Sequence, residues 1–387
     1  MSRAVSTFAL RQWQNEALGE WRKHNSGIIE VVTGGGKTVF ALACVKELKP
    51  DTTLIVVPTT ALLDQWWEEA SNFFGLQLDE IHIITGSRRI RTGTINIAVL
   101  NTAAKLQESG RTVPCFLIVD ECHKAATPNF KSVLEIPKVA TLGLSATPER
   151  QYDEGLAEIL IPALGPVIYK YTYKEALRDG VIVPFELRNI IFELEEENQK
   201  AYDKLTGSIA RSINRMGMEA PETISLLLKR ARLLNLSTNR IRLTLKIVSS
   251  YKNNKIIVFH EDINACNIIQ EVLRDSNVSA GVYHSELPVR KRAEVLNAYR
   301  RGELNVLVTC RALDEGFNVP ETEIGIIAAS TATRRQRIQR LGRVLRPISG
   351  KQSATVFTLV ATAPEISRLQ EEEKELEGVA DVIWSRA

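Results

Sequence analysis

The sequence predicts an α/β protein built from two doubly wound parallel-sheet domains. Apolar, β-branched runs recur along the chain, and amphipathic helical patterns separate them. These runs are continuous rather than alternating, which is typical of parallel strands buried on both faces. The chain has 387 residues, a length that suits two domains of roughly 150–200 residues each.

The expected elements follow one another in that order. In the first half, we expect strands at residues 28–33, 53–58, 95–100, 115–120 and 141–147. In the second half, we expect strands at residues 255–260, 280–284, 305–309, 323–330 and 354–360. The clearest amphipathic helical patterns cover residues 38–48, 61–74 and 287–301.

A segment with a different sequence pattern separates the two halves. Residues 193–250 contain no strand-like run and carry long helical patterns at 223–236 and 240–250. We interpret this segment as a helical insertion or linker. The tail from Ala363 onward is acidic and predicts a terminal solvated helix.

Composition excludes several classes of protein. The net charge is only +3, so any nucleic-acid surface must be local. The five cysteines show no C-x-x-C spacing, which favours buried reduced thiols. No secretory segment opens the chain, and no apolar run approaches the ~18 residues of a membrane span. We therefore expect a cytoplasmic protein with no membrane partner.

A glycine-rich turn is the most informative local pattern. The apolar run at residues 28–32 leads into Thr33, three glycines at 34–36, and then Lys37 and Thr38. This order of strand, turn and helix suits a phosphate-binding loop, because glycines and the helix N-terminus present N–H groups to phosphate. Lys37 would reach the β- and γ-phosphates, and Thr38 would hold Mg²⁺. Val31 stands where a full pattern has glycine, so a chance glycine turn is the alternative for the loop taken alone.

Two adjacent acids end a later apolar run. Asp120 and Glu121 follow residues 116–119 and precede Cys122 and His123. At the carboxyl end of a parallel strand, Asp120 can bind Mg²⁺ through water and Glu121 can deprotonate the attacking water. A polar turn after a strand is the simpler alternative.

The residues Asp120-Glu121-Cys122-His123 resemble the D-E-x-H box of superfamily 2 helicases. Further segments resemble the other motifs of that superfamily in the expected order, from residue 8 to about 362: residues 10–14 (the adenine-reading element), 57–66 (motif Ia), Thr102, 143–150 (motif III), 255–259 (motif IV), 308–320 (motif V) and 339–346 (motif VI). The wording of residues 180–185 and 341–346 is most similar to the XPB-like group, which includes phage and bacterial repair or restriction-type helicases. Two differences stand out: Gln151-Tyr152 follow Arg150 where XPB proteins carry Arg-Glu-Asp, and Asn318 replaces a common aspartate of motif V.

This resemblance implies two tandem RecA-like domains with a helical insertion between them. The implied boundaries are residues 1–175 for the ATP-binding domain, 176–250 for the linker and insertion, 251–365 for the second domain and 366–387 for the acidic tail. It implies ATP and Mg²⁺ as cofactors and nucleic acid as partner, DNA rather than RNA. A nuclease or repair protein is a possible further partner.

The resemblance also assigns roles to single residues. The implied catalytic residues are Lys37, Asp120, Glu121, Arg343 and Arg346, and the Mg²⁺ ligands are Thr38 and Asp120. The implied ATP-binding residues are Arg11, Gln14, Thr33, Gly34, Gly36, Lys37, Thr38, Gly316 and Gln339. The implied coupling residues are His123, Ser145 and Thr147, and the implied nucleic-acid contacts are Pro58, Thr59, Thr102 and Thr309.

Some patterns keep two interpretations. Arginines recur every three residues from Arg334 to Arg346, which indicates either a solvated basic face or, at Arg343 and Arg346, arginine fingers on the γ-phosphate. Trp66 and Trp67 favour core packing over base stacking. His284 ends a strand and either faces nucleic acid or belongs to the core.

The predicted function is that of an ATP-dependent superfamily 2 helicase or translocase on DNA. The group resemblance favours 3′-to-5′ movement and a place in DNA repair, recombination or defence. The alternatives are an RNA-directed helicase and an ATP-gated DNA clamp that recruits a nuclease or repair partner.

Overall fold

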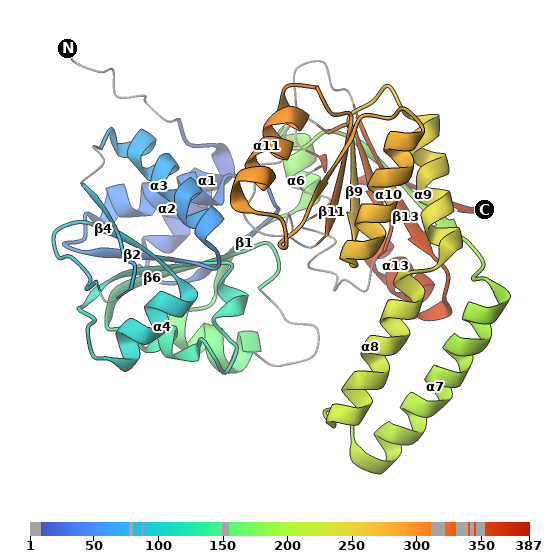
Figure 1. The fold of residues 1–387 in the computed structure, drawn as a ribbon. Coiled ribbons are helices and arrows are strands. Elements are labelled where there is room, and N and C mark those ends of the chain that lie inside the picture. The colour runs from blue at the N-terminus through green and yellow to red at the C-terminus, as the bar shows by residue number, and fades with distance from the viewer. Residues whose placement is uncertain are drawn as a thin grey trace. The chain divides into compact units, whose positions relative to one another are not determined.

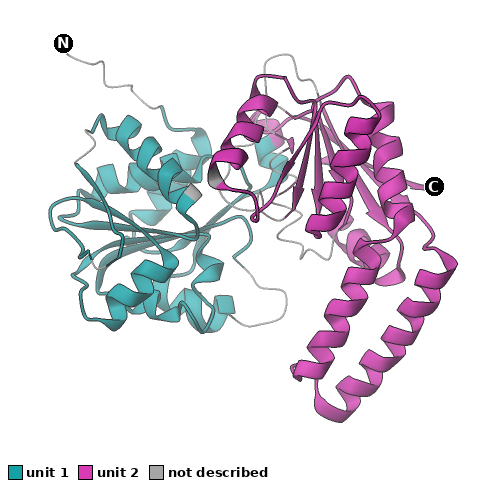
Figure 2. Cartoon of the chain, viewed as in Figure 1, with its two compact units in different colours: residues 1–176, 315–317 teal, residues 177–314, 318–387 magenta. Residues whose placement is uncertain are grey.

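The computed structural model describes residues 9–76, 80–86, 88–148, 155–310, 322–329, 340, 344–345 and 353–387. The chain forms two compact units, divided after Ala176 (Figure 2). Within the described residues, each unit holds one seven-stranded sheet whose strand pairs are all parallel. The predicted α/β class of parallel sheets is therefore confirmed.

The first unit is a sheet in the order β3-β4-β2-β5-β6-β1-β7 with helices around it (Figure 1). Its strands are β1 (Ile28–Val31), β2 (Thr53–Val57), β3 (Ile81–Ile83), β4 (Ile95–Val99), β5 (Cys115–Asp120), β6 (Lys138–Ser145) and β7 (Val167–Tyr171). Its helices are α1 (Gln12–Trp21), α2 (Lys37–Leu48), α3 (Thr60–Phe74), α4 (Leu100–Glu108), α5 (Ile161–Leu164) and α6 (Tyr173–Arg178, at the division), with short turns η1 (Cys122–Lys124), η2 (Lys131–Glu135) and η3 (Leu156–Leu160).

The second unit repeats this plan in the order β10-β11-β9-β12-β13-β8-β14. Its strands are β8 (Phe185–Ile191), β9 (Ile256–His260), β10 (Ala280–Tyr283), β11 (Val306–Cys310), β12 (Ile324–Ile327), β13 (Ala354–Val360) and β14 (Ala380–Arg386). Its helices are α7 (Glu196–Met216), α8 (Pro221–Asn235), α9 (Thr238–Ser250), α10 (Ile263–Asp275), α11 (Val289–Arg300) and α13 (Ala363–Glu375).

The sheets form because their central strands are mainly apolar and fully buried. Every residue of β2, β5, β9 and β11 is buried, as expected for parallel strands with helices on both faces. Helix starts are set by side-chain caps: Thr59 accepts a hydrogen bond from Leu62 N, and Asp262 accepts one from Ala265 N at 3.1 Å. All five cysteines are buried and none is in a disulfide, as the interpretation as reduced thiols requires. None of the helices in the described ranges is long and apolar enough to cross a bilayer.

The segment between the sheets differs in detail from the expectation. Helices α7 and α8 pack side by side as a hairpin that extends beyond the second sheet (Figure 1), and α9 packs on α10. The segment also contains β8, which lies between β13 and β14. In β8, buried Phe185, Leu187 and Asn189 alternate with half-buried residues, so the strand lacks the continuous apolar run on which the prediction was based.

The acidic tail is not only a helix. Helix α13 begins at a capping box of Thr362 and Glu365, as an exposed terminal helix would, but β14 follows it and pairs with β8. Half-buried and exposed residues alternate along β14, because it is the edge strand of the sheet. Edge strands β3 and β7 were missed for a related reason, since they are short or only partly buried.

Candidate nucleotide site and nucleic-acid interface

The phosphate loop adopts a conformation that only glycine tolerates well. Gly34 and Gly36 have φ of 85° and 99°, in the left-handed region. A Cβ on Gly35 would lie 2.4 Å from Val31 Cγ1, so a side chain there has no room. Helix α2 then begins at Lys37 with Gly36 as its N-cap, and its N-terminal N–H groups remain available for an anion.

The N-terminal element holds this loop through its backbone carbonyls. Arg11 Nη1 donates to Gly35 O at 2.9 Å, and Gln14 Nε2 donates to Gly36 O at 3.0 Å. Gln14 Oε1 in turn accepts from Arg11 N at 2.8 Å. Both side chains therefore fix the shape of the loop, while their predicted contact with ATP stays a prediction.

The lysine of the loop is paired with the second acid. Lys37 Nζ lies 3.3 Å from Glu121 Oε1, and both side chains are largely buried. Glu121 itself has φ of 48° and ψ of 50°, an uncommon conformation for a residue other than glycine. Such strain concentrates at functional sites because the surrounding structure must hold it. Here it turns the Glu121 carboxylate toward Lys37.

Asp120 is buried at the end of β5, and both of its carboxylate oxygens accept hydrogen bonds. Glu121 N donates to Oδ1 at 2.9 Å, and Trp66 Nε1 donates to Oδ2 at 2.8 Å. Burial, and then the charge of Glu121, raise the pKa of Asp120 to about 6, although Lys37 acts in the opposite direction. A nearby divalent cation would favour the ionised form of this carboxylate.

The pKa of Glu121 is shifted in the opposite direction. Burial acts to raise the pKa of Glu121, but the charges of Lys37 and His123 outweigh it and place that pKa below its usual value. Glu121 is therefore ionised at neutral pH, which is the state that a general base requires.

A polar chain leads from the acids to the end of β6. His123 Nδ1 lies 3.5 Å from Glu121 Oε2 and 3.1 Å from Ser145 Oγ. Ser145 Oγ accepts from Thr147 N at 3.1 Å. Ser145 and His123 are both buried, so the chain runs through the interior from the phosphate loop to the residues after β6. The three predicted coupling residues are thus brought together with Glu121.

The residues present fit a magnesium nucleotide. Thr33 Oγ1 and Glu121 Oε2 are buried and form no hydrogen bond within the described ranges. Such atoms are costly to leave unpaired, and a bound nucleotide with its metal and waters would satisfy them. The Asp120 oxygens each keep a free lone pair, and with the Thr38 hydroxyl they are the hard oxygen donors that Mg²⁺ prefers.

Three of the four predicted nucleic-acid contacts lie at the carboxyl edge of the first sheet. Pro58 and Thr59 follow β2, and Thr102 lies in the first turn of α4 after β4. All three are half-buried rather than covered. Thr309 differs, because it is only 1% exposed within β11, so the structure does not present it at the surface.

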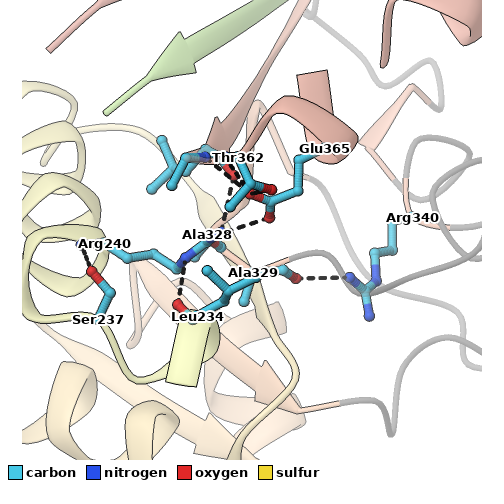
Figure 3. Close-up of polar contacts among 10 residues, drawn as sticks. Leu234, Ser237, Arg240, Ala328, Ala329, Arg340, Thr362 and Glu365 are labelled. Carbon is cyan, nitrogen blue, oxygen red and sulfur yellow. Dashed lines mark hydrogen bonds and ion pairs between the residues drawn. The ribbon is translucent and has the colours of Figure 1, made fainter. Parts of the chain in front are cut away.

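In the second unit, two buried arginines hold neighbouring carbonyls after β12 (Figure 3). Arg240 Nη1 donates to Ala328 O at 2.8 Å, and Arg340 Nη1 donates to Ala329 O at 3.4 Å. Arg340 Nη2 also lies 2.5 Å from Glu261 Oε1. Arg340 is therefore a buried structural residue rather than part of a solvated basic face. The predicted ATP-site residues Gly316, Gln339, Arg343 and Arg346 lie outside the described residues.

Sequence reasoning missed the polar role of Trp66. Its ring is 1% exposed, which confirms the interpretation as core packing, but its indole N–H donates to the predicted metal ligand Asp120. The pair is 54 residues apart in sequence, so no local pattern could have found it. His284 is buried too, which favours its assignment to the core.

Comparisons with known proteins identify the family. Residues 7–150 match the family described as type III restriction enzyme, res subunit, and residues 239–347 match the helicase conserved C-terminal domain. The chain is 32% identical over 357 residues to the DNA 3′-5′ translocase XPB2 of Sulfurisphaera tokodaii, covering 87% of this chain and 78% of that protein. This chain belongs to the XPB-type superfamily 2 helicases. The resemblance seen in the motifs is thereby confirmed.

Other members and a solved structure agree. The DNA 3′-5′ helicase XPB of Kineococcus radiotolerans is 26% identical over 366 residues, covering 92% of this chain and 61% of that protein. The chain thus spans less than two thirds of this XPB-type relative. The Pyrococcus furiosus Hef helicase domain matches with a TM-score of 0.60 at 17% identity, covering 94% of this chain and 98% of that domain. That match supports the RecA-like fold of both units.

Proposed function

We propose that this chain is an ATP-dependent DNA translocase or helicase that moves 3′-to-5′ and serves DNA repair, recombination or defence. The observation that carries the proposal is the connected set of Lys37, Glu121, His123 and Ser145. It joins a phosphate loop to a buried general base and then to the residues after β6. A protein that only binds nucleotide has no need of a base in this position.

The chemistry follows from the state of each side chain. Lys37 leaves Glu121 to bind the β- and γ-phosphates, and the α2 N-terminus holds the same phosphates through N–H groups. Thr38 and Asp120 would hold Mg²⁺, which when bound neutralises phosphate charge. The ionised Glu121 then accepts the proton of the attacking water. Arg343 and Arg346 remain the proposed residues that stabilise charge on the γ-phosphate.

Coupling to nucleic acid is proposed to pass through His123. When Lys37 moves to the phosphates, the Glu121 carboxylate loses its contact with the Lys37 ammonium. Its interaction with His123 then changes. His123 in turn contacts Ser145 Oγ, which caps the backbone at Thr147. The state of the nucleotide would thus alter the segment after β6.

DNA is the proposed nucleic-acid substrate. Pro58, Thr59 and Thr102 line the carboxyl edge of the first sheet, where phosphate contacts would be independent of sequence and sensitive to salt. The names of the relatives, DNA 3′-5′ translocase and DNA 3′-5′ helicase, support DNA over RNA and the stated polarity. A nuclease or repair protein is proposed as a further partner.

ATP hydrolysis by the purified chain tests the proposal. The assay compares no nucleic acid, single-stranded DNA, duplex DNA, forked DNA and RNA, beside Lys37→Ala and Glu121→Gln. Strong stimulation by DNA that both substitutions abolish is the expected result. ATP binding without hydrolysis on every substrate would contradict the motor and indicate a clamp.

A further inference from the structure

The indole of Trp66 is in direct contact with the predicted metal ligand. Trp66 Nε1 donates to Asp120 Oδ2 at 2.8 Å, and Glu121 N donates to Oδ1 at 2.9 Å. Two donors from different elements therefore fix the plane of the carboxylate. One of them, Glu121 N, belongs to the adjoining residue, so Trp66 is the donor that a distant part of the fold supplies.

This contact is not simply the way in which a buried indole finds a partner. Trp21 is also fully buried, and its Nε1 donates to a backbone carbonyl, Thr141 O, at 2.9 Å. Trp13 is buried with no hydrogen-bond partner for its Nε1 in the described ranges. Burial in this unit therefore neither requires an indole partner nor directs it to an acid, whereas Trp66 meets the carboxylate that the proposed function assigns to Mg²⁺.

The position of Trp66 links two parts of the site. It lies in α3, about two helical turns after Thr59, which caps that helix and is a proposed nucleic-acid contact. Strand β2, which leads into α3, pairs directly with β5, which ends in Asp120. Leu62, Leu63 and Ala70 are buried on the same helix, so α3 is a packed, rigid element rather than a loop.

We propose that Trp66 is a positioning residue: its N–H orients Asp120 for Mg²⁺ and ties that orientation to the nucleic-acid end of helix α3. The inference rests on the proposed function, because it uses Asp120 as the metal ligand and Thr59 as a DNA contact. A phosphate bound at Thr59 shifts α3, the indole follows, and the carboxylate turns with it. Donors of this kind to a metal ligand orient it, and their loss typically weakens metal affinity about 10- to 100-fold.

Trp66→Phe is the direct variant, because it removes the N–H donor and keeps a buried aromatic side chain, although the phenyl ring is smaller than the indole. Trp67→Phe is the matched control, since the neighbouring residue is half-buried on the same helix. The first measurement is binding of ADP to each protein as Mg²⁺ is varied. We expect Trp66→Phe to raise the Mg²⁺ concentration needed for half-maximal ADP binding about tenfold. Its affinity for ADP without Mg²⁺ should stay unchanged, and the Trp67→Phe protein should bind ADP as wild type does under both conditions.

Indole N–H NMR gives a readout that is independent of hydrolysis. The chain has five tryptophans, so it gives five indole signals, and the Phe variants assign them one by one. We expect the Trp66 signal to move when Mg²⁺ and ADP are added together and again when single-stranded or duplex DNA is added. The Trp21 signal, from an indole bonded to a backbone carbonyl, is the internal reference. If Trp66→Phe does not fold, variants of the other four tryptophans still assign the signal.

The outcomes separate two failures. The inference is overturned, and the proposed function left standing, if the Trp66 indole signal does not shift when DNA is added. The same holds if the Trp66→Phe protein has lower thermal stability but an unaltered Mg²⁺ dependence of ADP binding. A wild-type protein that binds no magnesium nucleotide overturns both. A shifted Mg²⁺ dependence together with loss of DNA stimulation in Trp66→Phe, and not in Trp67→Phe, supports the inference.

Discussion

The Lys37 ammonium lies 3.3 Å from the Glu121 carboxylate, in a largely buried pair. Under the proposed function, Lys37 binds phosphate and Glu121 acts on water, so binding of ATP would have to separate the two groups. This exchange would free Glu121 when Lys37 engages the phosphates, and the pair would keep the site inactive until nucleotide binds.

Glu121→Gln should separate binding from hydrolysis. The amide cannot accept the proton of the attacking water, so we expect the turnover rate to fall at least about a hundredfold. ATP affinity should be equal or higher, because Lys37 no longer has a competing anion. Nucleotide titration and turnover measured on the same protein check this, beside Lys37→Ala, which should lose ATP binding. Weaker ATP binding in Glu121→Gln would contradict the pairing.

Ser145→Ala should uncouple hydrolysis from DNA. The change removes the hydroxyl that His123 Nδ1 and Thr147 N share, at a cost in stability of about 1 kcal/mol. We expect basal hydrolysis to persist and stimulation by DNA to fall about fivefold or more. The measurement is turnover as a function of DNA concentration. Unchanged stimulation would show that the buried chain through His123 does not transmit the nucleotide state.

Arg240→Ala should be severely destabilising. Arg240 Nε donates to Leu234 O at 3.1 Å, its Nη1 donates to Ala328 O and Leu359 O, and its Nη2 pairs with Glu365 at 3.1 Å (Figure 3). Removal would leave Glu365 buried without its cation, so we expect a loss of about 3–5 kcal/mol in unfolding free energy.

Arg242→Ala provides the control for that loss. Arg242 lies on the same helix but is exposed, so its removal should change the unfolding free energy by no more than about 0.5 kcal/mol. Urea unfolding of the two variants makes the comparison. Equal losses would mean that the buried network does not stabilise the second unit.

His260 should make stability depend on pH. Burial, and then the charge of Arg240, lower the pKa of His260 to about 4 in the folded protein, although Asp262 and Glu261 act to raise it. Its Nδ1 accepts from Asp262 N at 3.1 Å, so protonation there would break a hydrogen bond. Below pH ~6.5 His260 is protonated in the unfolded chain but stays neutral in the folded chain. Stability from this group is thus complete above pH ~6.5 and is lost as the pH falls toward about 4.

Urea unfolding at pH 7.5 and 5.0 measures that loss, which we expect to reach about 2 kcal/mol at the lower pH. His260→Asn should remove this part of the pH dependence, because the amide oxygen keeps an acceptor but does not titrate. His24→Asn, at an exposed site, is the control and should behave as wild type. The same pH dependence in His260→Asn and in wild type would contradict the assignment.

The sequence predicts the interior strands well and the outer ones poorly. Strand β5 was expected at the residues that form it, because a strand buried on both faces reads as a nearly continuous apolar run. Charged or polar residues interrupt strands β8 and β14, for example Arg188 and Asp381, so these strands resemble loops or helix termini in a search for continuous apolar runs. Their place in the sheet depends on pairing with residues far away in sequence.

The candidate site divides in the same way. Glycines, Lys37 and the two acids are visible because phosphate binding demands those residue types at fixed local spacing. The Trp66–Asp120 and Lys37–Glu121 contacts are not visible, because they arise only when the parallel strands of one sheet align their carboxyl ends. Arg340 shows the opposite kind of error. It belongs to the arginine repeat that indicates a basic face or arginine fingers, but its side chain is buried and structural.

Directional strand displacement tests the central claim most directly. The purified chain is given ATP and Mg²⁺ with duplexes that carry either a 3′ or a 5′ single-stranded tail, beside Glu121→Gln. The account predicts ATP-dependent displacement from the 3′-tailed duplex, little from the 5′-tailed one and none with Glu121→Gln. Displacement that favours the 5′ tail, or that proceeds equally with Glu121→Gln, would contradict it.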